Sequence, residues 1–341
     1  MDQTKTLASG TFYLTIMQAL NYAMVFAFYV LVARILSPNE VGSFSLLLMV
    51  ISVFNTLTLL ALNNAVIKYV SESLGRGDEE KAVASSKKAF KLILNISLPA
   101  LFVGFALSPT LSSYIRASIL DIICILASAF ALNLTNFYGA VMFGYSMFKE
   151  VSLQNILYTF SSRIFGVLLA YLGCRLLGLS LGFLIGSTIT LLYSLLVLRG
   201  RLKPSREDYP SIELLKFSIP LYGGNIIGLV QGWFDIAILS SLVGLDGAGT
   251  YYIAVSSIVP LTILWTPLSS ALFPTMSSIN GRGNMKEIGE VHEKILKVAT
   301  AIILPLGIAL ASVSQTALSI AYGKSMLEQV YPSLYLHRLP S

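Results

Sequence analysis

Long, unbroken runs of apolar residues divide this chain. Four of them cover 7–33, 41–62, 122–143 and 176–198. Each supplies the roughly 20 residues that an α-helix needs to cross a bilayer, whereas the helices and strands of a soluble core are usually shorter. The runs therefore predict transmembrane helices.

Charged residues are scarce in this chain. Charged residues make up 12% of the chain and hydrophobic residues 55%, whereas soluble domains carry about a quarter charged residues. The first apolar run is too long for the core of a cleavable signal peptide, so we expect it to be retained as a span. Cys124 and Cys174 lie in or beside apolar runs, which favours small core residues over a disulfide or a metal site.

The pattern predicts an all-α polytopic membrane protein with about nine transmembrane helices, at 7–33, 41–62, 90–107, 119–143, 152–173, 176–198, 215–244, 251–273 and 296–314. Lysine and arginine set the orientation, because they gather on the cytoplasmic side of membrane proteins. The N-terminal tail and the even-numbered loops hold 17 of them, and the opposite loops hold four. We therefore expect a multi-pass protein of the cell membrane with a cytoplasmic N-terminus, whose net positive charge reflects topology and contact with the lipid bilayer, with no nucleic acid partner.

An internal repeat divides the chain into two related parts. A shift of 206 residues places 75–77 on 281–283, and the same register aligns Lys88, Lys91, Ile96 and Pro99 with identical residues. One residue out of that register, 42–44 matches 249–251 at the start of the second span of each part. Six spans separate the copies, so both have the same orientation, which is typical of parallel-repeat transporters.

The second part lacks counterparts of the fourth to sixth spans. We therefore expect an N-terminal six-helix lobe over 1–205, the first three helices of a C-terminal lobe over 206–323, and a short tail over 324–341. The ending is neither a span nor a clear helix cap, which suggests truncation relative to a longer parent.

Several segments in a fixed order resemble one family of transporters: 34–42 after the first span, 68–72 with the Gly-Arg-Gly-Asp loop at 75–78, then Asp235, 249–251 and 273–274. The sequence resembles the polysaccharide biosynthesis branch of the multidrug/oligosaccharidyl-lipid/polysaccharide (MOP) flippase superfamily. The resemblance covers the chain from its N-terminus to about Gly323. It implies two lobes around a central cavity that opens alternately inward and outward, and a flippase that moves lipid-linked oligosaccharide or polysaccharide precursors across the cell membrane.

Ionisable residues inside spans are costly and therefore become candidates for function. Arg163 falls near the middle of the fifth span, where a guanidinium could bind the phosphate of a lipid-linked glycan through a bidentate fork. A structural pair with an acidic or carbonyl group is the alternative. Asp235, in the outer part of the seventh span, could contact a coupling cation or sugar hydroxyls, or could pair with Arg34 or Arg163.

Polar stripes mark one face in each of two equivalent spans. The first span carries Gln18, Asn21, Tyr22 and Tyr29, and the seventh carries Asn225, Gln231 and Asp235. Helical periodicity places each set on one face, which favours a hydrophilic cavity between the lobes, although hydrogen bonds between helices would give similar stripes.

The sequence lacks the usual signs of catalysis. No phosphate-binding loop is present, both histidines lie outside the spans, and no aqueous loop could hold a catalytic domain. We therefore expect a non-enzyme without a cofactor. The alternatives are a drug/cation antiporter of the same superfamily, a membrane-embedded sugar polymerase or ligase, and an inactive truncated fragment. The coupling ion, sodium or proton, stays open.

Overall fold

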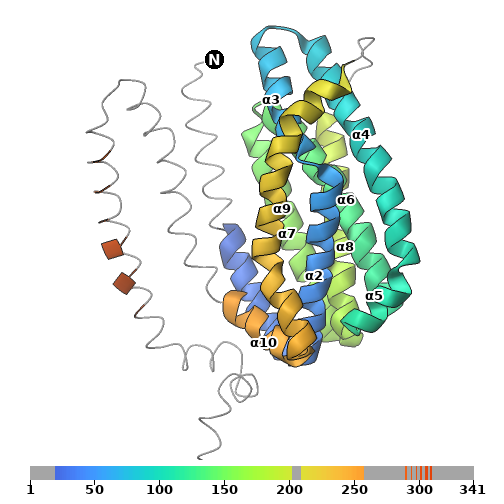
Figure 1. Cartoon of the computed structure of the whole chain (residues 1–341), viewed down its shortest axis with the longest axis vertical. Coiled ribbons are helices and arrows are strands. Elements are labelled where there is room, and N and C mark those ends of the chain that lie inside the picture. The colour runs from blue at the N-terminus through green and yellow to red at the C-terminus, as the bar shows by residue number, and fades with distance from the viewer. Residues whose placement is uncertain are drawn as a thin grey trace, which may run out of the picture.

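The computed structural model describes residues 20–201 and 209–256, with a few single positions between 289 and 308. In these residues the chain is helical throughout (Figure 1). A first helix, Leu20–Ile35, is followed by α2 (Pro38–Leu59), α3 (Leu62–Gly75), α4 (Glu79–Ala106), α5 (Ser108–Ile115), α6 (Ile119–Gly144), α7 (Phe148–Leu169), the π-helical turn η1 (Ala170–Cys174), α8 (Arg175–Leu198), α9 (Ser211–Leu242) and α10 (Leu245–Ser256).

The all-α membrane fold predicted from the sequence is confirmed. Five helical segments are long and apolar enough to cross a membrane within the described ranges: α2, α4, α6, the continuous stretch Phe148–Leu198 and α9. Most of the predicted ninth span, residues 257–273 of the predicted eighth span, and the first part of the predicted first span, including Gln18, lie outside the described residues.

One connection was predicted wrongly. Residues 63–89, which lie between the predicted second and third spans, form most of α3, a short turn and the first turns of α4. The helices extend beyond the apolar runs because their polar turns are amphipathic. In α4 the small residues Ala82, Ala84 and Ala89 are buried, while Lys87 and Lys88 between them are half-buried.

Side-chain caps define where several helices begin. The Ser37 hydroxyl accepts from the Glu40 amide at 3.4 Å, and the Glu40 carboxylate accepts from the Ser37 amide at 2.9 Å, which is a capping box. Ser118 and Asp121 form the same arrangement at α6. Arg175 also donates to Glu40 at 2.6 Å, so the starts of α2 and α8 are tied together at one end of the bundle.

Glycines bring α7 and α8 into close contact. Gly178, Gly182 and Gly186 recur at every fourth position of α8, a spacing that lets helix backbones approach within membranes. A Cβ added at Gly182 would lie 2.7 Å from the Ser162 carbonyl oxygen, and one at Gly186 would lie 2.6 Å from the Ser162 amide nitrogen. This contact fixes the rotation of α7 about its axis.

We expect Gly182→Val to lower the stability of the purified protein by about 1–3 kcal/mol, because overpacking forces the two backbones apart. The measurement is the thermal unfolding midpoint in detergent. Gly228→Val in α9 is the matched control, since a Cβ there meets nothing within 4 Å. Equal midpoints for the two variants would contradict a packing role for Gly182.

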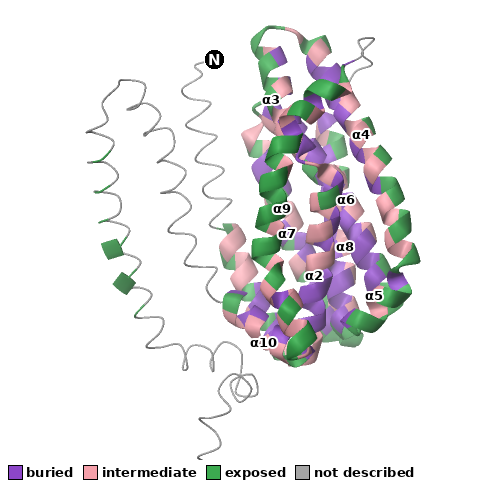
Figure 2. Cartoon of the chain, in the orientation of Figure 1, coloured by how far each residue is buried: buried purple, intermediate pink, exposed green. Residues whose placement is uncertain are grey.

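The exposure of the helices differs sharply across the bundle. In α9 only Leu214, Ser218 and Ile236 are buried (Figure 2), whereas α2 and α6 are largely covered by their neighbours. Large apolar side chains such as Ile227 and Leu242 are exposed on α9. In a bilayer such a surface is matched to lipid hydrocarbon, so its exposure is compatible with a membrane-spanning helix.

Candidate functional site

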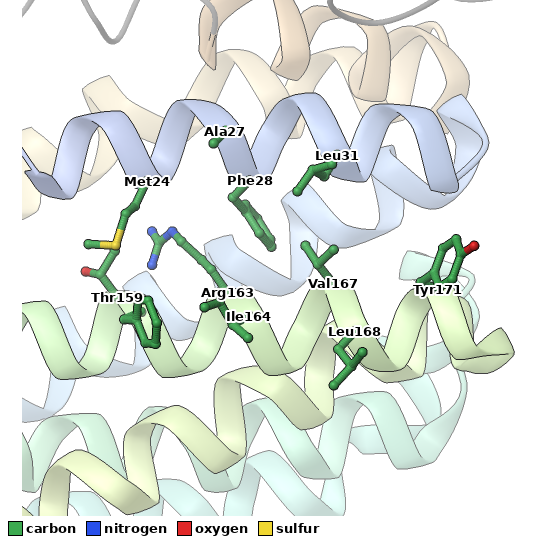
Figure 3. A pocket seen from close by; sticks show the side chains of 11 residues that line it. Met24, Ala27, Phe28, Leu31, Thr159, Arg163, Ile164, Val167, Leu168 and Tyr171 are labelled. Atoms are coloured by element: carbon green, nitrogen blue, oxygen red, sulfur yellow. The ribbon is translucent and has the colours of Figure 1, made fainter.

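A pocket of about 430 Å³ lies between the first helix and α7 (Figure 3). Its lining is mostly apolar, with one cation and two hydroxyls among the side chains: Met24, Ala27, Phe28, Leu31, Thr159, Phe160, Arg163, Ile164, Val167, Leu168 and Tyr171. The two helices run side by side along the pocket, so side chains three or four positions apart form its walls.

Arg163 is the single charged group of this pocket. It projects from α7 toward the first helix, between Met24 and Phe28 (Figure 3). Its guanidinium carbon lies 5.6 Å from the centre of the Phe28 ring, within cation–π range. This direction follows from the packing of α7, because the preceding residue, Ser162, lies against the glycines of α8.

The hydrogen-bonding capacity of Arg163 is mostly unused. One Nη donates to the Ser162 hydroxyl at 3.5 Å, and the buried Nε has no hydrogen-bond partner. In the part of the chain that the structure describes, no carboxylate forms an ion pair with it. A guanidinium has five N–H donors, and a partly buried cation without a partner is costly. The site is therefore suited to an anion.

Polar groups of the first helix surround this arginine. Asn21 accepts a hydrogen bond from the Thr159 hydroxyl at 2.7 Å, one helical turn before Arg163. The hydroxyls of Tyr29 and Tyr252 are 2.6 Å apart, and the Tyr29 ring lies 5.3 Å from that of Phe28, over which the Arg163 guanidinium lies. The structure thus brings Asn21, Tyr29 and Arg163 into one region.

Tyr252 joins the second part of the chain to this region. Its ring meets that of Tyr29 edge-on, with centroids 5.4 Å apart, and stacks on Trp233 of α9 at 6.3 Å. Neither Tyr252 nor Trp233 was among the residues predicted for the site. Aromatic residues are common in apolar spans, so only the position of Tyr252 beside the repeated 249–251 segment could have drawn attention to it.

Asp235 lies in a separate arrangement on α9. Its carboxylate accepts from the Tyr251 hydroxyl at 2.5 Å and from the Ile236 amide at 2.8 Å. Among the described residues Arg163 is not one of its partners. Asn225 and Gln231 are exposed on the same helix, and Tyr22 is half-buried on the first helix. None of these three is among the side chains that line the Arg163 pocket.

The start of α2 crosses the start of α10 at a pair of glycines. A Cβ at Gly42 would overlap the carbonyl oxygen of Leu245, and a Cβ at Gly249 would overlap that of Pro38. In the register that aligns 42–44 with 249–251, Pro38 corresponds to Leu245, so the two contacts are equivalent. The Asn39 amide also donates to Asp246 at 3.5 Å, and these two positions correspond in the same register.

A second contact between the two parts lies at the opposite end of the bundle, where α3 meets the first turns of α9 (Figure 1). The Lys68 ammonium lies 4.4 Å from the centre of the Phe217 ring, and the Tyr69 hydroxyl donates to the Glu213 carbonyl at 3.2 Å. Tyr209 donates to the Glu213 carboxylate at 2.8 Å. Burial, and then this hydrogen bond, raises the pKa of Tyr209, which keeps its hydroxyl protonated.

The described residues offer no obvious metal site, because no three histidine, cysteine, aspartate or glutamate side chains come together in them. The candidate site therefore consists of a cation that has no carboxylate partner within 20–201 and 209–256, nearby hydroxyl and amide groups, and apolar walls.

Comparison with known families decides the class of this membrane protein. The family model described as "Polysaccharide biosynthesis protein" matches residues 31–331. The chain belongs to the polysaccharide biosynthesis protein family. A search of curated protein sequences found no match.

Solved structures show the fold of this polysaccharide biosynthesis protein. An inward-facing multidrug resistance MATE family transporter of the MOP superfamily has a TM-score of 0.68 and 15% identity, over 92% of this chain and 77% of that chain. A MOP superfamily transporter from Pyrococcus furiosus has a TM-score of 0.64 and 17% identity, over 92% of this chain and 74% of that chain. The family member therefore has a MOP transporter fold.

Proposed function

We propose that this member of the polysaccharide biosynthesis family is a flippase that moves a lipid-linked oligosaccharide or polysaccharide precursor across the cell membrane, and that it is not an enzyme. The observation that carries the proposal is the Arg163 cation, which has no carboxylate partner among the described residues and lies in a helical stretch long enough to span a membrane. A fixed cation within a membrane-spanning helix favours an anionic group on the substrate that crosses the membrane. A lipid phosphate has the charge and geometry that match a guanidinium.

Movement would occur by alternating access between the lobes 1–205 and 206–323. The contact of α2 with α10 closes one end, because backbones that touch at Gly42 and Gly249 leave no space between them. Opening this end requires the two helices to separate, with loss of the Asn39–Asp246 and Tyr29–Tyr252 hydrogen bonds. A few localised contacts of this kind suit a two-state switch.

The distribution of lysine and arginine supports an N-terminus in the cytoplasm and the α2–α10 contact at the outer side of the membrane. In that orientation the first helix runs outward, and the capped turn at Ser37 faces the exterior. The exposed side-chain amides of Asn225 and Gln231 on α9 would then lie where sugar hydroxyls pass.

The proposal is tested by measuring lipid-linked oligosaccharide on the cytoplasmic leaflet of cells that lack the protein. We expect it to accumulate, and we expect the wild-type chain to relieve the accumulation. Arg163→Ala should restore flipping at a rate lower by roughly tenfold or more, because hydrogen bonds to a charged group contribute about 1.5–3 kcal/mol.

The rate comparison needs equal amounts of folded protein, measured by detergent extraction and gel filtration. Val230→Ala, on the exposed face of α9, is the control and should relieve the accumulation as the wild type does. Absence of accumulation in cells without the protein would rule out the proposed function.

A further inference from the structure

Two lysines of like charge lie close together on the first turns of α4. Lys87 and Lys91 are four residues apart, so their side chains are neighbours on the surface of the helix. Within the parts of the chain that the structure describes, neither forms an ion pair. The carboxylates of α4, Glu79 and Glu80, lie about two turns or more before Lys87. Like charges at this spacing destabilise a helix, so an anion bound beside them would stabilise it.

The internal repeat provides a direct comparison. In the register that aligns Lys91 with Lys297, Lys87 aligns with Glu293. The Lys297 ammonium lies 2.6 Å from the Glu293 carboxylate. The second copy of the repeat therefore neutralises its lysine with a carboxylate one turn earlier, whereas the first copy has a second lysine at that position. A group that neutralises the first copy in the same way has to come from outside the helix.

Lys87 and Lys91 lie where α4 enters the bilayer. The helix has 28 residues, and at 1.5 Å per residue its length of about 42 Å exceeds the hydrocarbon core of about 30 Å. A span of about 20 residues that ends at Ala106 begins at Lys87. Lysine side chains near the end of a span extend toward the interface, so both ammonium groups are expected at the level of the phospholipid phosphates. The distribution of lysine and arginine favours the cytoplasmic side.

The two lysines share one side of α4 with exposed apolar residues. Lys87, Lys91, Leu98 and Phe102 follow one another at spacings of four, seven and four residues, which places them along one side of the helix. Leu98 and Phe102 are exposed, and Ile93, on the opposite side, is buried. The helix itself lies at the edge of the bundle (Figure 2). The lysines therefore lie at the end of a lipid-facing stripe, where a lipid head can meet them while its chains meet the stripe.

We propose that Lys87 and Lys91 bind the head of an anionic phospholipid of the cytoplasmic leaflet, whose acyl chains lie along Leu98 and Phe102. The single negative charge of its phosphodiester takes the place that the Glu293 carboxylate has in the second copy. The site is on α4, whereas the pocket with Arg163 lies between the first helix and α7. The inference thus concerns a lipid that the protein holds from the bilayer and does not depend on the proposed transport.

The test measures how tightly the purified full-length chain binds phosphatidylglycerol, by native mass spectrometry from detergent. Lys87→Glu gives the first copy the glutamate–lysine pair of the second. We expect the first phosphatidylglycerol to bind this variant at least about fivefold more weakly than the wild type, which corresponds to about 1 kcal/mol. Glutamate before lysine is the favourable order for an ion pair at this spacing, so the unfolding midpoint of the lipid-free variant should equal or exceed that of the wild type.

Lys149→Glu, at an exposed position in the first turn of α7, changes the net charge by the same amount and should bind phosphatidylglycerol as the wild type does. Phosphatidylcholine, whose head has no net charge, should bind all three proteins equally weakly. Glycerol phosphate, which has the head without the chains, should leave the unfolding midpoint of the wild type unchanged.

Each comparison can contradict the proposal, and none involves flipping, so the flippase proposal is tested separately. Equal affinity of the wild type and Lys87→Glu for phosphatidylglycerol would overturn it, as would an equal loss in Lys149→Glu, which would indicate attraction by net charge alone. Binding of phosphatidylcholine as tightly as phosphatidylglycerol would also overturn it. A rise in the midpoint with glycerol phosphate would assign the lysines to a soluble phosphate in place of a lipid.

Discussion

Gly42→Ala is expected to abolish transport while leaving the protein in the membrane at close to the normal level. The added methyl group would overlap the Leu245 carbonyl oxygen and lie 2.8 Å from its carbon. Both are backbone atoms, so no side chain can move to make room, and the start of α10 must shift away from α2. The closed end could then no longer form, and a transporter that cannot close one end cannot complete its cycle.

The matched control is Gly232→Ala in α9, where a Cβ meets nothing within 4 Å. Alanine in an open helical position is expected to stabilise the helix by about 0.5–1 kcal/mol, so this variant should transport normally. Gly249→Ala should reproduce the defect, because its Cβ would lie 2.6 Å from the Gly42 amide nitrogen. Normal transport by both Gly42→Ala and Gly249→Ala would show that this crossing does not act as a gate.

A reversible covalent link across the same crossing should stop transport in proportion to the fraction of molecules linked. Asn39 and Asp246 lie opposite each other, with 3.5 Å between the amide nitrogen and a carboxylate oxygen. We expect Asn39→Cys with Asp246→Cys to react with a short bifunctional thiol reagent that a reductant can cleave. Flipping in vesicles should fall with linking and recover after reduction.

The experiment uses a variant in which the two free cysteines, Cys124 and Cys174, are replaced with serine. Each single-cysteine variant treated with the same reagent is the control, since it can react without joining the helices. Undiminished flipping by the linked protein would mean that α2 and α10 stay together throughout the cycle.

The sequence predicted the membrane-spanning helices because each apolar run is longer than any soluble element would need. It did not predict the break after α2, where Leu60 and Ala61 have φ of 48° and 56°. Neither is a glycine or a proline, so no local signal marks the break. The helical character of 62–75 was missed for a related reason, since its lysine and glutamate side chains lower the hydropathy of a helix whose other face is buried.

For the candidate site, too, the sequence predicted one part and not the rest. Arg163 could be chosen from the sequence because a charge within an apolar run is rare. Its surroundings could not, because the contact of Thr159 with Asn21 and that of Tyr29 with Tyr252 join residues more than 130 positions apart. The α8 glycines were visible as a regular spacing, but their effect on the direction of Arg163 depends on which helix they meet.

The attachment of the first turns of α9 to α3 has a mechanical consequence. Leu214 and Ser218 are buried there, and Lys68 and Tyr69 hold Phe217 and Glu213. Two residues beyond Ser218 comes Pro220, which cannot donate a helical hydrogen bond, and Gly223 and Gly224 follow. The first turns of α9 are thus attached to the N-terminal part of the chain, although the helix belongs to the C-terminal part. We expect the bending between the two parts of the chain to concentrate at this weak turn. The first turns of α9 would then stay fixed to the N-terminal part while the rest of the helix moves with the C-terminal part.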